Sequence, residues 1–200
     1  VASDTAVVNA TAAAWGESMP EGEALKATLT HIADLPGVAS AYIGRPDGSY
    51  ETSKHFPAGY DPRTRQWYKA SAANPDKAVM SKPTTAASDG KTVVTLSRAI
   101  VRNGALIGVL SINIELDAAR EAVKDVKVGK TGALIILGPD TEYIHHSTYT
   151  LADKFKEIDG GAYKDLAAKL TTGKPEQIEA DYQGSKKFYA GVPVGEAGGW

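Results

Sequence analysis

The sequence predicts an α+β protein in which an N-terminal helical segment precedes two antiparallel-sheet modules. Three observations lead to this fold class. The first 35 residues have helical periodicity, and the chain after them alternates between β-rich runs and tight turns. The order strand, Pro-Asp turn, strand then occurs twice, at Pro46-Asp47 and again at Pro139-Asp140, which is typical of a duplicated module.

Residues 1–35 form the predicted helical segment. The first helix covers residues 1–19, where apolar side chains recur at roughly helical spacing until Pro20. The second covers residues 23–35, which carry an apolar stripe and are followed by Pro36-Gly37, a helix stop signal.

Residues 36–116 form the first predicted sheet module. Its opening hairpin consists of residues 38–44 and 49–53, joined by the turn Arg45-Pro46-Asp47-Gly48. A helix ending near Ala73 and a loop follow. Two long strands, 91–101 and 105–116, are then joined by Arg102-Asn103-Gly104, a strong hairpin signal because Asn and Gly tolerate positive φ.

Residues 117–128 form a predicted connecting segment with a short amphipathic helix, and residues 129–200 form the second module. Residues 132–146 repeat the strand, Pro-Asp turn, strand pattern, and residues 181–194 parallel the turn and long strand of residues 88–101. The repeat ends at Trp200, where the first copy continues into one more strand. We therefore expect the second module to be truncated at its last strand.

Composition excludes several functional classes. The net charge is −2 with scattered Lys and Arg, so the basic stripe that nucleic-acid binding requires is missing. Cysteine is absent, which excludes disulfides, cysteine nucleophiles and thiolate metal sites. No run approaches the roughly 20 apolar residues of a membrane span. We expect no catalytic residue, no metal and no cofactor.

Residues 59–70, Gly-Tyr-Asp-Pro-Arg-Thr-Arg-Gln-Trp-Tyr-Lys-Ala, combine arginine with aromatic residues beside an Asp-Pro turn. The guanidinium of Arg65 matches a carboxylate two-to-two, and Trp67, Tyr68 and Tyr60 would supply apolar walls with polar tips. If Arg65, Trp67 and Tyr68 line one pocket, the segment through Arg65 must be extended and the helix must begin later. The alternative is an arginine that covers ordinary aromatic packing.

This motif and the order of the elements resemble the double Cache (dCache) sensor domain, the extracytoplasmic module of bacterial chemoreceptors and sensor kinases. The resemblance covers nearly the whole chain. It implies a long N-terminal helix, of which residues 1–19 would be the end, followed by two PAS-like antiparallel sheets, the membrane-distal one holding the ligand. It further implies that Arg65 and Trp67 hold a ligand carboxylate, with Tyr68, Tyr60 and Tyr42 around the ligand.

Amino-acid-binding members of that family place two acidic residues against the ligand ammonium group. The position on the last strand of the distal module corresponds here to Asn113, and the loop position falls near Ala86, with Asp89 close enough to substitute. An unpaired ammonium is costly to bury, and Asn113 can both donate and accept hydrogen bonds. The ligand is therefore expected to be an organic acid or an amino acid, with the organic acid favoured.

The sequence thus predicts the ligand-binding, periplasmic part of a membrane-anchored chemoreceptor, a methyl-accepting chemotaxis protein. A sensor domain of a histidine kinase or of a cyclic-dinucleotide enzyme is the first alternative. A small hydrolase or lyase with His145 or His146 as base is another, and a purely structural module a third. His145, His146 and Glu142 are not expected to bind a metal, because adjacent strand residues point to opposite faces. The intact receptor is expected to form a homodimer through the N-terminal helix, and the isolated domain a monomer.

Overall fold

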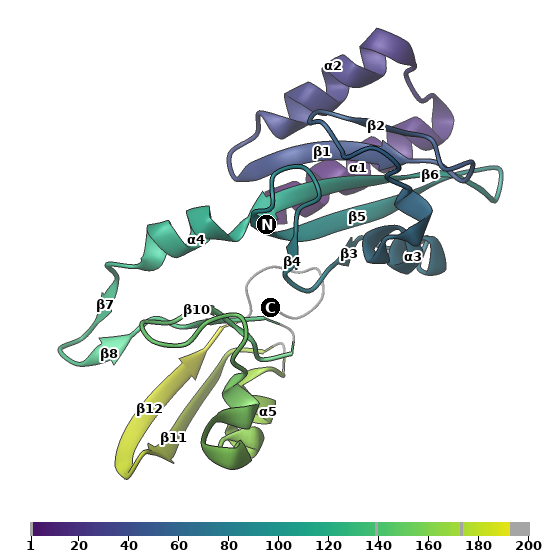
Figure 1. Ribbon diagram of the computed structural model, residues 1–200. Helices are drawn as coiled ribbons and strands as arrows, with labels where there is room; N and C mark the ends of the chain where they lie inside the picture. Colours follow the sequence, from purple (N-terminus) through teal and green to yellow (C-terminus); the bar gives the residue numbers. More distant parts are fainter. Residues whose placement is uncertain (1, 139, 173, 193–200) are drawn as a thin grey trace. The chain divides into compact units, whose positions relative to one another are not determined.

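The computed structural model describes residues 2–138, 140–172 and 174–192, and the chain divides into two compact units, Val1–Ala119 and Arg120–Trp200. Each unit combines helices with antiparallel strands (Figure 1). The fold is therefore α+β, as predicted. Among the described residues, no helix is both long enough and apolar enough to cross a membrane.

The first unit is a twisted antiparallel sheet with helices on both faces. Two helices lead into it, α1 (Ala2–Glu17) and α2 (Gly22–Ala33). The strands are β1 (Val38–Gly44), β2 (Tyr50–Thr52), β3 (Val79–Met80), β4 (Thr84–Thr85), β5 (Thr92–Arg102) and β6 (Ala105–Glu115). Their spatial order is β2-β1-β6-β5-β3, and β4 also pairs with β5. Every pairing is antiparallel.

The β5–β6 hairpin follows the sequence-based prediction to within one residue. Its turn residues Asn103 and Gly104 have φ values of 51° and 78°. Most L-residues avoid this region, whereas Asn and Gly enter it at low cost, so the dipeptide fixes the register of the two longest strands.

Strand alternation gives the first unit two separate apolar layers. One face of the sheet packs against α1 and α2 and contains the larger core. The other face carries an aromatic cluster of Tyr42, Phe56, Trp67, Tyr68 and Val109. Because neighbouring strand residues point to opposite faces, Tyr42 faces the aromatic layer while Ala41 and Ile43 face the helices.

In the described part of the second unit, the strands form three two-stranded sheets. They are β7 (Lys127–Val128) with β8 (Gly132–Ala133), β9 (Ile136–Leu137) with β10 (Tyr143–His145), and β11 (Glu176–Tyr182) with β12 (Ser185–Gly191). Helix α4 (Leu116–Val123) precedes them, and η2 (Phe155–Gly161) and α5 (Lys164–Leu170) lie between β10 and β11.

This arrangement differs from the continuous sheet of the first unit. There β1 is hydrogen-bonded on both sides, by β2 and β6. In the described part of the second unit, no strand joins the three pairs in the way that β6 joins β1 to β5. The predicted hairpin of residues 132–146 is therefore present only as short pairs.

Some sequence-based predictions lie outside the described residues. One is the second Pro-Asp turn, of which Pro139 is not described. Another is the expected truncation at the last strand, which concerns residues 193–200. The boundaries at residues 35, 116 and 128 stay predictions.

Candidate functional site

The Asp-Pro turn places the arginine-aromatic motif. Asp61 caps a 3₁₀ turn, η1 (Pro62–Thr64), and its side chain accepts a hydrogen bond from Arg63 N at 2.9 Å. Pro62 occupies the first position of the turn, where its missing N–H and fixed φ are tolerated. Arg65 is extended (φ −83°, ψ 144°), and helix α3 (Gln66–Ala73) begins after it. The backbone thus has the extended segment and late helix start that a shared pocket requires.

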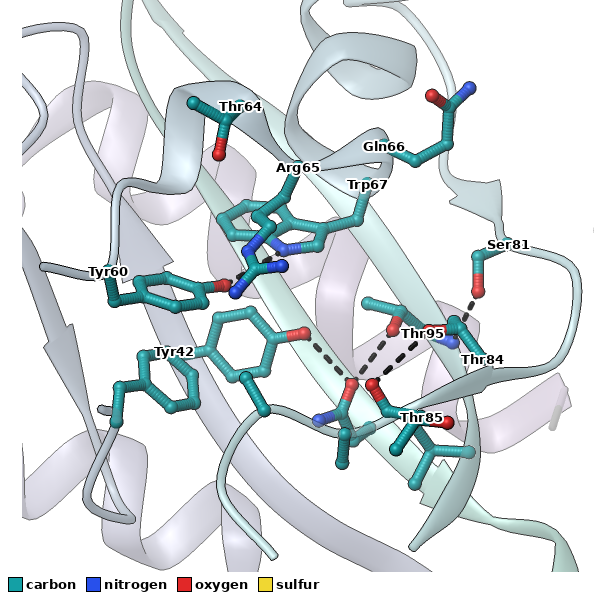
Figure 2. A pocket seen from close by; sticks show the side chains of 15 residues that line it. Tyr42, Tyr60, Thr64, Arg65, Gln66, Trp67, Ser81, Thr84, Thr85 and Thr95 are labelled. Atoms are coloured by element: carbon teal, nitrogen blue, oxygen red, sulfur yellow. Dashed lines mark hydrogen bonds between the residues drawn. The ribbon is translucent and has the colours of Figure 1, made fainter. Parts of the chain in front are cut away.

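A cavity of about 280 Å³ lies between this motif, the aromatic face of the sheet and the loop that carries β4. This volume lies just below the range of roughly 300–1,000 Å³ that is common for ligand pockets, so the cavity suits a ligand at the small end of that range. Figure 2 shows the side chains around it. The lining residues are Tyr42, Phe56, Tyr60, Thr64, Arg65, Gln66, Trp67, Ser81, Thr84, Thr85, Ala86, Ala87, Val93, Thr95 and Asn113.

Arg65 lies over the ring of Tyr60, with its Cζ atom 4.6 Å from the ring centroid. Trp67 Nε1 donates a hydrogen bond to Tyr60 Oη at 3.2 Å, so these three side chains form one unit (Figure 2). Burial raises the pKa of Tyr60 above its ordinary value of about 10, so the phenol keeps its proton. The wall therefore presents a permanent cation beside neutral aromatic groups.

A buried hydrogen-bond network around Asn113 forms the other end of the cavity. Asn113 Oδ1 accepts from Tyr42 Oη and from Thr95 Oγ1, both at 2.8 Å. Asn113 Nδ2 donates to Ser40 Oγ at 3.1 Å. Asn113 is only 4% exposed, and burial raises the pKa of Tyr42 far above its ordinary value. The network holds the amide in one orientation and keeps Tyr42 protonated.

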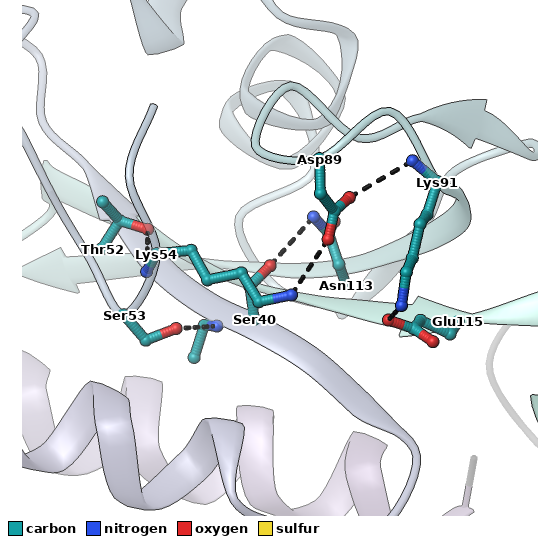
Figure 3. Close-up of polar contacts among 9 residues, drawn as sticks. Ser40, Thr52, Ser53, Lys54, Asp89, Lys91, Asn113 and Glu115 are labelled. Atoms are coloured by element: carbon teal, nitrogen blue, oxygen red, sulfur yellow. Dashed lines mark hydrogen bonds and ion pairs between the residues drawn. The ribbon is translucent and has the colours of Figure 1, made fainter. Parts of the chain in front are cut away.

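The structure places five of the seven predicted ligand residues in the lining, namely Tyr42, Tyr60, Arg65, Trp67 and Asn113. The other two lie elsewhere. Tyr68 is buried beside Trp67, with ring centroids 5.6 Å apart, and does not line the cavity. Asp89 also lies outside the lining, and its Oδ2 accepts from Lys54 Nζ at 3.0 Å (Figure 3).

Sequence reasoning missed the hydroxyl-bearing wall of Ser81, Thr84, Thr85 and Thr95. One signal could have revealed Thr95. It pairs directly with Asn113 in the β5–β6 register, and that register follows from the Asn-Gly turn. Thr84 and Thr85 form the two-residue strand β4, and Ser81 directly follows the two-residue strand β3. Strand alternation gives no guide in elements this short.

The two histidines of the second unit line a separate cavity of about 190 Å³. His145 ends β10 and His146 lies beyond that strand, so strict strand alternation does not separate them. His146 Nδ1 accepts from the backbone N–H groups of Thr148 and Tyr149, and burial together with His145 lowers its pKa. Glu142 Oε2 accepts a hydrogen bond from Asp140 N at 2.9 Å. Among the described residues, no group of three potential metal ligands occurs.

The family model described as a Cache domain (dCache_1) matches residues 5–200, almost the whole chain. The chain belongs to the Cache-domain family. It is therefore a sensor domain and not an enzyme, and the hydrolase or lyase alternative is set aside.

The chain is also similar to curated chemotaxis receptors and to solved ligand-binding domains of chemoreceptors. Methyl-accepting chemotaxis protein McpB of Bacillus subtilis is 33% identical over 135 residues, which are 66% of this chain and 20% of McpB. The ligand-binding domain of the Pseudomonas fluorescens chemoreceptor CtaA with L-alanine has a TM-score of 0.72 and 18% identity, covering 98% of this chain and 82% of that one. The domain of the Pseudomonas aeruginosa amino-acid chemoreceptor PctC with GABA has a TM-score of 0.71 and 20% identity, covering 98% and 84%.

These structural likenesses establish the fold. The chain spans about one fifth of the length of the curated receptors that it matches.

Proposed function

We propose that this Cache domain is the extracytoplasmic ligand-binding part of a membrane-anchored chemoreceptor and that it binds a small carboxylate in the cavity of its first unit. The observation that carries the proposal is the position of Arg65. It is the one charged side chain among the fifteen lining residues, all of which the structure describes. It lies over the ring of Tyr60, whose hydroxyl accepts a hydrogen bond from Trp67.

The geometry suits a carboxylate for two reasons. A guanidinium offers parallel N–H donors that match the two carboxylate oxygens, and it stays charged at any physiological pH. The stacked Tyr60 ring restricts the rotamers of Arg65, so less entropy is lost when the ligand binds. In this arrangement Arg65 holds the carboxylate and Trp67 forms the adjoining wall.

A bound ligand can influence the packing of α1, because the cavity and α1 both contact strands β5 and β6. On β5, Thr95 lines the cavity, and the next residue, Leu96, belongs to the core against the helices. On β6, Asn113 lines the cavity, and the preceding residue, Ile112, belongs to the same core. A ligand that favours one arrangement of these strands therefore favours one packing of α1. The size of the effect is limited by the difference in ligand affinity between the two arrangements.

In the intact receptor, we propose that the subunits form a homodimer through the N-terminal helix. The side of α1 that is turned away from the sheet supports this, because Ala6, Ala10, Ala13 and Ala14 are exposed there. Small side chains allow another helix to approach closely. The output module attached to the receptor is proposed to be of the methyl-accepting type, as in the curated relatives.

A thermal-shift panel tests the proposed ligand class. We expect one or more C2 to C6 carboxylates to raise the melting temperature, and the corresponding carboxamides to have no effect, because they lack the charge that Arg65 pairs with. Arg65→Ala should remove the shift. Arg63→Ala is the matched control, since Arg63 is paired with Asp61 and does not line the cavity. A shift that survives Arg65→Ala would contradict the proposal.

A further inference from the structure

The side chains that line the cavity carry a net charge of +1. Its lining contains Arg65 but neither Asp nor Glu. A bound monocarboxylate neutralises this charge. A zwitterionic amino acid would add an ammonium group with no opposing carboxylate in the wall, and an unpaired charge withdrawn from water costs several kcal/mol.

Two hydrogen-bond acceptors at the Asn113 end of the cavity, Asn113 Oδ1 and Ser81 Oγ, are already in use. Both lone pairs of Asn113 Oδ1 receive hydroxyl donors, from Tyr42 and from Thr95. The nearby Ser81 Oγ accepts from Thr95 N at 2.9 Å and donates to Lys82 O at 2.7 Å. An ammonium group needs acceptors, and these oxygens have little capacity left for it.

The same end of the cavity retains a donor. Asn113 Nδ2 carries two hydrogens, and the bond to Ser40 uses one of them. The other can donate to a ligand oxygen. A hydroxyl or keto oxygen beside the carboxylate therefore matches this end, and an ammonium group does not.

The counter-charge that the sequence offered, Asp89, is paired with other residues. Asp89 Oδ2 accepts from Lys54 Nζ at 3.0 Å, and Asp89 Oδ1 accepts from Lys91 N at 3.2 Å (Figure 3). Burial alone would raise the pKa of Asp89, but the bonds from Lys54 and Lys91 lower it below its ordinary value. Lys91 Nζ is in turn paired with Glu115 at 2.8 Å. The carboxylates of Asp89 and Glu115 are thus paired with Lys54 and Lys91, which do not line the cavity.

We infer that the cavity selects a small monocarboxylate whose other polar groups are uncharged oxygens, such as a 2-hydroxy or 2-oxo acid, and rejects the corresponding amino acid. The inference rests on the proposed function, because it concerns the far end of the ligand that Arg65 holds. It also separates this domain from the structurally similar CtaA and PctC domains, whose structures contain L-alanine and GABA.

Matched ligand pairs test the inference by isothermal titration calorimetry. Each pair shares one carbon skeleton and one carboxylate and differs only in hydroxyl against ammonium: L-lactate and L-alanine, glycerate and L-serine, 2-hydroxy-4-methylpentanoate and L-leucine. We expect at least one hydroxy acid to bind at least tenfold more tightly than its amino acid. Tighter binding of the amino acids, or no binding by any hydroxy acid, would overturn the inference. The proposed function would survive either result if another carboxylate binds in an Arg65-dependent way.

Two variants identify the residue responsible. Asn113→Asp keeps the shape of the side chain, accepts from Tyr42 and Thr95, and adds the missing negative charge. It should shift the preference within each pair at least tenfold toward the amino acid. Asp89→Asn should leave the preference of the natural protein unchanged. Amino-acid binding that disappears in Asp89→Asn would identify Asp89 as the counter-charge and contradict the inference. Even if Asn113→Asp does not fold, the matched pairs on the natural protein decide the question.

Discussion

Arg63 and Arg65 lie two positions apart in one motif, and the backbone between them gives them different environments. Arg63 forms a bidentate pair with Asp61, at 2.8 Å between Nη2 and Oδ2 and 3.0 Å between Nε and Oδ1, which lowers the pKa of Asp61. Arg65 is extended and turns over Tyr60 into the cavity. Residue type alone could not have separated the two arginines.

At Asn113 we predict a large cost in stability for an apolar substitution. Asn113→Leu would leave the hydroxyls of Tyr42, Thr95 and Ser40 without their shared partner in a buried site, for a loss of about 3 kcal/mol in the free energy of unfolding. Chemical denaturation measures it. Ser111→Ala is the control, because Ser111 Oγ is buried and has no hydrogen-bond partner among the described residues. Equal losses in both variants would contradict the network.

Ligand affinity should depend little on pH between about 5.5 and 9. The ionisable lining residues are Arg65, which stays charged, and Tyr42 and Tyr60, whose raised pKa values keep them neutral. Below pH ~4 the ligand carboxylate itself takes up a proton, so binding weakens as the pH falls. Calorimetric titrations across this range measure the profile. A change in ligand affinity with a midpoint near pH 6 to 7 would contradict this profile and show that a histidine takes part in binding.

At the scale of elements, close contact between β1 and the motif positions Trp67. A Cβ atom on Gly44 would lie 2.6 Å from Pro62 Cβ and 2.9 Å from Trp67 Cη2. Only glycine allows β1 and η1 to approach in this way.

We therefore predict that Gly44→Ala affects stability and binding together. Pro62 or Trp67 must move to make room, which should cost about 1–3 kcal/mol in the free energy of unfolding and weaken ligand binding. Denaturation and calorimetry on the same variant measure the two effects. Unchanged affinity would show that the position of Trp67 does not depend on this contact.

The sequence predicted the elements of the first unit because local signals there agree with the tertiary structure. Asn103-Gly104 fixes the β5–β6 hairpin, and Asp61-Pro62 fixes the turn before Arg65. Which aromatic side chain faces the cavity could not be read in the same way. Trp67 lines it and Tyr68 packs behind, because the helix begins only at Gln66. That starting point depends on packing against β1, which is a non-local contact.

In the second unit, local sequence signals do not agree with the strands that form. Its sequence repeats the hairpin pattern of the first unit, yet residues 132–137 contain only the two-residue strands β8 and β9. A β-rich pattern becomes a long strand only when a neighbour pairs with it along its length, as β6 does for β1 from Val38 to Gly44. Local sequence does not show whether such neighbours are present.

At the scale of the whole molecule, we predict that the isolated domain is monomeric at micromolar concentration. A 16-residue helix is roughly 24 Å long, and the exposed alanines of α1 offer little area compared with the roughly 800 Å² per partner of a stable interface. Sedimentation velocity should give one species of 21.0 kDa. A stable dimer would contradict this expectation and show that the domain carries a sufficient interface of its own.

The central claim is that Arg65 holds a ligand carboxylate beside the wall that Trp67 forms, and side-chain resonances report on it most directly. We would record ¹H–¹⁵N spectra while adding the carboxylate that gives the largest thermal shift. We expect the Arg65 Nε–H and Trp67 Nε1–H signals to move together with saturation, while the indole of Trp15, buried on the helix-covered face, stays in place. Saturable binding that moves neither Arg65 nor Trp67 would contradict the account.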